Sequence, residues 1–216
     1  AGFTTMMEAM DPAPAVAVLN AYLDRMIAIA FAHGGTLDRI MGDAVAIVFS
    51  APIPQSDHRQ RALDCALAMD AFASVYATDV QSTQGIAFGH TRIGVHTGEV
   101  IVGNFGGSTM FDYRALGDAV NTASRLEGVN KHLGTRMCVS AATLAGCQGT
   151  PVRPVGQLVL KGKTQSLQVF EPMAAQTMGY APLTEYEDAY AAMEAQSPAA
   201  PQAFSKLAQR FPQDPL

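Results

Sequence analysis

The chain has 216 residues, of which 49% are hydrophobic and 15% are charged, and its formal net charge is −5. These values are typical of one globular domain with a small appendage and argue against disorder. They also argue against a nucleic-acid partner, because binding to a phosphate backbone requires a basic surface. The longest apolar runs, 26–32 and 44–49, are shorter than the roughly 18 residues that a membrane span needs.

The first predicted elements are a helix and a hairpin. Apolar residues recur at helical spacing over 14–33, and two glycines follow that end the helix. Two apolar strands, 37–41 and 44–50, are separated only by Gly42 and Asp43. Glycine in the first central position predicts a type II′ turn, which leaves the Asp43 carboxylate at an exposed tip beside the sheet.

The rest of the chain predicts a mixed fold. In chain order, the pattern predicts a helix over 57–77, a second hairpin over 92–102, a helix over 118–133, and shorter strands near 137 and over 158–170. This order favours the α+β class, with helices packed on one face of a sheet. Two short helices, 185–195 and 201–211, then predict an αα-hairpin. We therefore expect a domain over 1–175 and a C-terminal appendage over 176–216.

Four segments in this order resemble the catalytic domains of class III adenylate and guanylate cyclases. They are Gly2-Phe3-Thr4, the RIMGD segment at 39–43, the GDAVNTASRLE segment at 117–127 and the LKGK segment at 160–163. The IGVHTG segment at 93–98 also matches. Each piece is weak alone, but together, in the same order and spacing, they cover roughly residues 1–172. The resemblance implies a ferredoxin-like sheet and nucleotide cyclase activity.

The cyclase resemblance implies a particular reaction. The ribose 3′-hydroxyl of a nucleoside triphosphate attacks the α-phosphorus, and pyrophosphate leaves. Two divalent ions, Mg²⁺ or Mn²⁺, assist such a step, and Asp43 is the expected ligand because hard ions prefer carboxylate oxygens. In the family a second metal aspartate precedes Gly-Phe-Thr by three positions, so we expect the chain to start inside this motif. Backbone N–H groups near Phe3 and Thr4 would bind the phosphates.

The predicted helix over 118–133 carries the implied catalytic pair. Asn121 and Arg125 are four residues apart, so both lie on one face. By resemblance, Asn121 orients the ribose, Arg125 stabilises the charge that develops at the α-phosphate, and Lys161 contacts the triphosphate. From the residues alone, a solvated helix face and a surface lysine remain alternatives. We interpret His96, at a strand end, as structural.

Base recognition is where the sequence departs from the family pattern. Adenylate cyclases of this class have a lysine at the position of Arg39, and an aspartate or threonine at the position of Arg114. Arg39 can still donate to a ring nitrogen, but a guanidinium accepts no hydrogen bond, so Arg114 cannot read the adenine amine in the family's way. The alternative is that Arg114 pairs with an acid, and Asp38 and Asp112 are near enough in sequence to separate the two guanidiniums.

These observations lead to one main hypothesis and its alternatives. We expect a cytoplasmic catalytic domain that favours ATP over GTP and works as a homodimer, with metal carboxylates from one protomer and Asn121 and Arg125 from the other. An upstream sensor or membrane segment is compatible with this. The alternatives are a guanylate cyclase, or a binding or dimerisation module that has lost turnover, which Arg39 and Arg114 motivate. A diguanylate cyclase is disfavoured because its signature of two glycines, two acids and a phenylalanine is absent.

Overall fold

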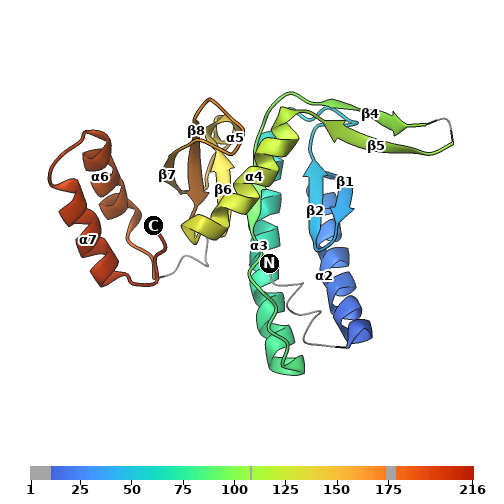
Figure 1. Cartoon of the computed structure of the whole chain (residues 1–216), viewed down its shortest axis with the longest axis horizontal. Helices are drawn as coiled ribbons and strands as arrows, with labels where there is room; N and C mark the ends of the chain where they lie inside the picture. The colour runs from blue at the N-terminus through green and yellow to red at the C-terminus, as the bar shows by residue number, and fades with distance from the viewer. Residues whose placement is uncertain (1–10, 108, 174–178) are drawn as a thin grey trace.

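The computed structural model describes residues 11–107, 109–173 and 179–216, and shows a mixed α+β chain (Figure 1). The helices are α2 (Pro12–Ala32), α3 (His58–Gln84), α4 (Asp118–Leu133), α5 (Ala141–Leu144), α6 (Leu183–Glu194) and α7 (Ala200–Arg210). The strands are β1 (Thr36–Met41), β2 (Ala44–Val48), β3 (Ile93–Val95), β4 (Ile101–Gly106), β5 (Phe111–Leu116), β6 (Met137–Ser140), β7 (Val152–Leu158) and β8 (Leu167–Pro172). The predicted bounds of α4 are confirmed, whereas α3 continues to residue 84, past the predicted end at 77.

The described strands form three hydrogen-bonded units. β1 and β2 make the predicted hairpin, β4 and β5 make a second one, and the four-stranded sheet has the order β3-β6-β8-β7. The hairpin predicted over 92–102 is wrong, because β3 pairs in parallel with β6 and β4 pairs with β5. β4 continues to Gly106, and six residue pairs with β5 extend this hairpin away from the body as an arm (Figure 1).

Helices cover both faces of the four-stranded sheet at β6, rather than the single face expected from the sequence. Successive side chains of a strand point to opposite faces. Met137 and Val139 pack with Leu63 of α3, whereas Cys138, between them, packs with Leu126 of α4. The α+β class predicted from the sequence is confirmed, with two apolar layers that share one central strand.

Among the described helices, one, α2, has the length and the apolar composition that a membrane-spanning helix needs. This differs from the sequence expectation, which considered only uninterrupted apolar runs. One stripe of α2, including Tyr22, Leu23 and Met26, packs in a cluster with Cys65 and Met69 of α3. This packing accounts for part of the apolar composition, since 39% of the apolar window is buried.

The position of α4 on the sheet is set by a glycine. A Cβ atom built at Gly94 of β3 would lie less than 3.0 Å from the Ala123 carbonyl oxygen and the Glu127 nitrogen of α4. Real Cβ atoms do not make such contacts, so the helix backbone rests directly on the strand. The buried Asn130 amide reinforces this contact by donating to the Ile93 carbonyl at 3.0 Å.

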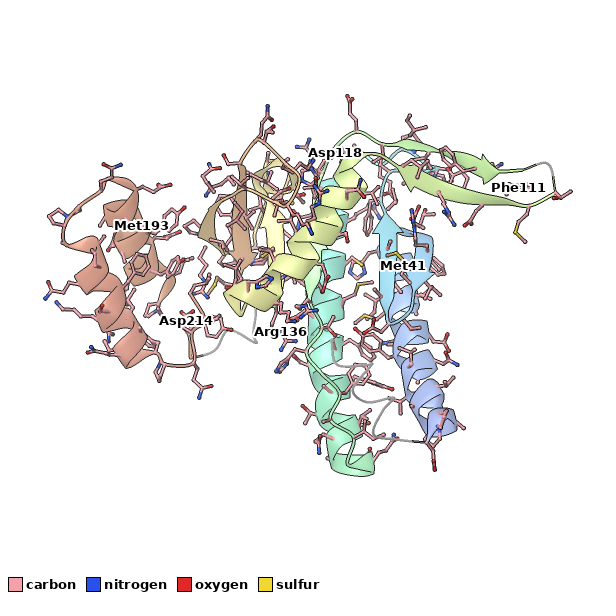
Figure 2. All side chains as sticks on the ribbon, in the orientation of Figure 1. Met41, Phe111, Asp118, Arg136, Met193 and Asp214 are labelled. Carbon is pink, nitrogen blue, oxygen red and sulfur yellow. The ribbon has the colours of Figure 1, made fainter. Side chains whose placement is uncertain are left out.

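Arg153 docks the C-terminal helices on the sheet. Its fully buried guanidinium pairs at 2.7 Å with Glu171 of β8 and with Asp214, which lies between the C-terminal helices and the sheet (Figure 2). The Tyr180 and Tyr186 rings lie 4.9 and 4.8 Å from the guanidinium carbon. Burial opposes ionisation of Asp214, but the hydrogen bonds from Arg153 and two backbone N–H groups hold its pKa below the ordinary value. The expected αα-hairpin is therefore attached to the sheet.

We predict that Gly94→Ala destabilises the chain by about 2 kcal/mol or more, because the added methyl group forces α4 off the strand. The matched variant is Gly128→Ala within α4, where a Cβ meets no atom within 4 Å. It should stabilise the chain by up to about 1 kcal/mol through helix propensity. Chemical denaturation measures both variants, and equal effects would contradict the close-contact explanation.

We also predict that Asp214→Asn loosens the C-terminal helices. It leaves Arg153 buried with one carboxylate, and breaking a buried ion pair costs about 3 kcal/mol or more. Hydrogen exchange of α6 and α7 should therefore become faster. Glu185→Gln is the control, because it breaks an exposed ion pair with Arg210 in the same helices and should change the exchange little. Unchanged protection in Asp214→Asn would refute the docking role.

Candidate active site

Helix α4 presents the two residues predicted for catalysis. The helix begins at Asp118, whose carboxylate in the first turn interacts favourably with the helix dipole. It ends before Gly134, a glycine in the left-handed conformation. Asn121 is exposed and Arg125 is half-buried. Their spacing of four residues places both on one side of the helix.

The Arg125 guanidinium lies against the loop between β7 and β8. A Cβ atom at Gly162 of this loop would be 3.5 Å from Arg125 Nη2. The Nη1 atom is buried and has no hydrogen-bond partner in the described part of the chain. A buried donor without a partner costs free energy. The geometry therefore suits an acceptor or an anion that the chain itself does not supply.

The same loop carries two lysines that differ in their contacts. Leu160 anchors it in the core, and the Lys163 backbone N–H donates to the Leu160 carbonyl at 2.9 Å, with Gly162 at a φ of +74°. The Lys163 ammonium pairs with the Asp118 carboxylate at the start of α4. Lys161 is exposed and has no ion-pair partner among the described residues. Arg125 and Lys161 thus form no ion pair with a described carboxylate, although the charge of Arg125 contributes to lowering the pKa of Asp118.

His96 has the surroundings of a structural residue. Its Nδ1 atom lies 2.9 Å from the Ser140 hydroxyl at the end of β6. Burial is the main reason that its pKa is lowered, and Lys163 lowers it further, while Asp118 opposes this. The hydrogen bond from Lys163 in turn lowers the pKa of Asp118. The lowered pKa favours the neutral form of the imidazole, and the structural role of His96 stays a prediction.

Asp43 lies at the tip of the β1–β2 hairpin, as predicted. Gly42 has a φ of +63°, and the Asp43 side chain is exposed. No group of three or more His, Cys, Asp or Glu residues that could hold a metal ion occurs in the described residues. Mg²⁺ is usually held by one or two carboxylates together with substrate phosphates. The exposed Asp43 carboxylate fits a contribution of this kind, but it does not form a metal site alone.

The two arginines at the implied base-recognition positions both pair with acids. Arg39 Nε donates to Asp38 at 2.7 Å, and Arg114 pairs with Asp112, also at 2.7 Å. The Arg114–Asp112 pair is the contact expected under the alternative for Arg114, while its role in substrate binding stays a prediction. Asp38 also accepts a hydrogen bond from the Ala115 backbone N–H at 2.6 Å. This bond joins β1 to β5, so positions 39 and 114 lie on adjoining strands.

The predicted site residues fall into two groups within the chain. Asn121, Arg125 and Lys161 lie at α4 and its neighbouring loop, while Asp43, Arg39 and Arg114 lie on the β1–β2 hairpin and β5. No hydrogen bond or ion pair joins the two groups in the portions of the chain that the structure describes. Figure 2 shows Asp118 at the top of α4, between the sheet and the base of the β4–β5 arm. Phe3 and Thr4 lie outside the described residues.

Sequence reasoning missed the pairing of Lys163 with Asp118 and the role of Gly94. The lysine was visible in the LKGK segment, but nothing in the sequence indicates that its ammonium reaches the start of α4. Gly94, between Ile93 and Val95, did carry a signal, because a glycine inside an apolar strand indicates a close backbone approach.

Comparisons with known proteins show the family to which the chain is similar. The family model of the adenylate and guanylate cyclase catalytic domain matches residues 1–171. Adenylate cyclase 1 of Rhizobium meliloti is 37% identical over 170 residues, which is 78% of this chain and 25% of that protein. The adenylyl cyclase CyaB from P. aeruginosa has a TM-score of 0.73 at 31% identity, covering 81% of this chain and 89% of that one. The guanylyl cyclase Cya2 has a TM-score of 0.71 at 30% identity, covering 80% and 87%.

The chain therefore belongs to the adenylate and guanylate cyclase catalytic domain family, and the fold class implied by the resemblance is confirmed. Its similarity to adenylate and guanylate cyclases is almost equal in the solved structures. The chain spans 25%, 8% and 35% of the length of three curated relatives that it matches.

Proposed function

We propose that this chain converts ATP to 3′,5′-cyclic AMP and pyrophosphate. The observation that carries the proposal is the Arg125 guanidinium. Its buried Nη1 has no partner among the described residues, and it lies against the loop that carries Lys161, which forms no ion pair with any of them. In the reaction the ribose 3′-oxygen loses its proton and bonds to the α-phosphorus, while the bond from this phosphorus to the α,β-bridging oxygen breaks. Arg125 is suited to the charge that develops, because it is always ionised and has donors in a fixed fork.

The other residues take the roles that family membership supports. Asn121 hydrogen-bonds the ribose, Lys161 binds the triphosphate, and the backbone N–H groups near Phe3 and Thr4 bind its outer phosphates. Asp43 is a ligand of Mg²⁺ or Mn²⁺, with two ions at each site. Such ions, when bound, neutralise phosphate charge and activate the attacking oxygen. The remaining ligands then come from the substrate and from residues outside the described set.

A homodimer with shared sites explains why the two residue groups lie apart in one chain. The β4–β5 arm supports this, because its tip exposes Phe111 (Figure 2), and Ile101 and Met110 are also largely exposed. An exposed apolar surface of this kind is typical of an interface. We also propose that residues 1–175 form the catalytic unit and 176–216 a docked appendage, and that the domain works in the cytoplasm.

The preference for ATP is part of the proposal. The alternative function is that of a guanylate cyclase, or of a nucleotide-binding module with weak turnover, and a specific observation favours it. Arg39 and Arg114 motivate it, because neither can accept a hydrogen bond from a base. Relatives named as adenylate cyclases support ATP, while the likeness to guanylyl cyclase Cya2 supports the alternative. Cyclic nucleotide formation from ATP and from GTP separates these readings.

We predict that Asp43→Ala and Arg125→Ala each lower kcat by about 100-fold or more in the full-length protein with Mg²⁺ or Mn²⁺, since each removes a charge that acts on the triphosphate. The matched controls are Asp24→Ala and Arg25→Ala, neighbouring exposed residues of α2, which should retain the activity. Measurement of both pyrophosphate and cyclic nucleotide follows the reaction. Undiminished turnover in either site variant would overturn the assignment.

The shared site makes a separate prediction. Mixing the Asp43→Ala and Arg125→Ala proteins should restore activity, because each mixed dimer then has one doubly altered site and one intact site. Random exchange makes half of the dimers mixed, so about one quarter of the normal activity is expected. No recovery, with exchange of subunits verified by differently tagged chains, would contradict the homodimer while leaving the roles of the two residues intact.

A further inference from the structure

We propose that Asp38 is a positioning residue for nucleotide selection, and that it acts by fixing the Arg39 side chain and the neighbouring strand β5. The inference rests on the proposed function only in placing Arg39 beside the base. Asp38 is outside the set of residues predicted to touch the substrate, and its side chain is 2% exposed.

Asp38 is the extra residue of a β-bulge. Leu37 pairs with Ile47 and Arg39 pairs with Ala46, so one residue of β1 has no partner on β2. Bulges are frequent beside active sites, where they re-aim a side chain. In a regular strand, neighbouring side chains point to opposite faces. The bulge instead brings the Asp38 carboxylate to 2.7 Å from the Nε of its neighbour Arg39.

Both oxygens of this carboxylate are used. Oδ2 accepts from Arg39 Nε, and Oδ1 accepts from the Ala115 backbone N–H of β5 at 2.6 Å. Ala115 is 1% exposed and follows Arg114. One buried charge therefore fixes the orientation of residue 39 and the distance between β1 and the strand that carries residue 114.

The Arg39 side chain keeps donors for a ligand. The guanidinium has five N–H groups, of which Nε–H is bonded to Asp38, so the four on Nη1 and Nη2 remain. With Nε held, the direction of these donors is fixed. The ligand class that this arrangement recognises is a purine with a ring nitrogen or a carbonyl oxygen as acceptor. Removal of the Asp38 carboxylate should therefore alter the discrimination between adenine and guanine.

The test measures binding without turnover. The probes are 3′-deoxy-ATP and 3′-deoxy-GTP, which lack the attacking hydroxyl, and the readout is the ratio of their Kd values for the full-length protein. Asp38→Asn is the informative change, since its amide oxygen can still accept from Ala115 N–H while its NH₂ group cannot accept from Arg39. We expect the ratio to shift by roughly tenfold, as for loss of one charge-assisted hydrogen bond.

A double-mutant cycle distinguishes positioning from a merely structural role. In an Arg39→Gln background, Asp38→Asn should change the ratio less than twofold, because the side chain through which it acts is gone. The control Asp57→Asn breaks a similar Arg Nε–carboxylate pair at 2.7 Å, with Arg61 in α3, and should leave the ratio unchanged. The thermal midpoint of each variant reports folding.

Three outcomes would overturn the inference. They are an unchanged ratio in Asp38→Asn, the same shift with and without Arg39, and failure of both analogues to bind the unaltered protein. Absence of cyclic nucleotide formation in the unaltered protein overturns the proposed catalytic function instead. A shifted ratio of Kd values in that case would still support the role of Asp38.

Discussion

The contact between Gly94 and the backbone of α4 is the constraint on which the site depends. The backbone of Ala123 and Glu127 contacts this glycine. On the same helix, Arg125 lies between these two residues and Asn121 precedes them. Because this contact is with the helix backbone, a displacement of the helix at this point also moves Asn121 and Arg125. A residue without a side chain therefore determines where the proposed catalytic residues lie.

Other contacts fix the two ends of this helix. At its start, Lys163 pairs with the Asp118 carboxylate. At its end, a Cβ at Gly134 would lie 2.7 Å from the Pro215 side chain, and Pro215 follows the Asp214 that pairs with buried Arg153. The C-terminal segment thus contacts the helix that carries Asn121 and Arg125. Attachment of the appendage and placement of the proposed catalytic helix are consequences of the same set of contacts.

The sequence predicted what local patterns encode. The local pattern after Gly117 predicted α4 over its observed bounds, and the Gly42-Asp43 pair predicted the first hairpin. The pairing of β3 with β6 could not be predicted from the sequence, because parallel partners are distant in the chain and short apolar strands specify no partner. Likewise, the acids near Arg39 and Arg114 were visible, but the bulge at Asp38 that directs one of them depends on register with β2.

The two arginine–aspartate pairs beside the proposed base position differ in burial, and this difference has a chemical consequence. Asp38 is buried and bonded through both oxygens, so Arg39 cannot leave it without exposing an unpaired carboxylate to the protein interior. The Asp112 side chain is 55% exposed, and solvent screens its pair with Arg114. Arg114 can therefore exchange Asp112 for water or for a ligand at little cost. Arg39 then provides a fixed set of donors, whereas Arg114 provides an adaptable one. Beside it, Asp112 Oδ1 accepts no hydrogen bond from the described residues, and it is the kind of acceptor that a guanidinium lacks.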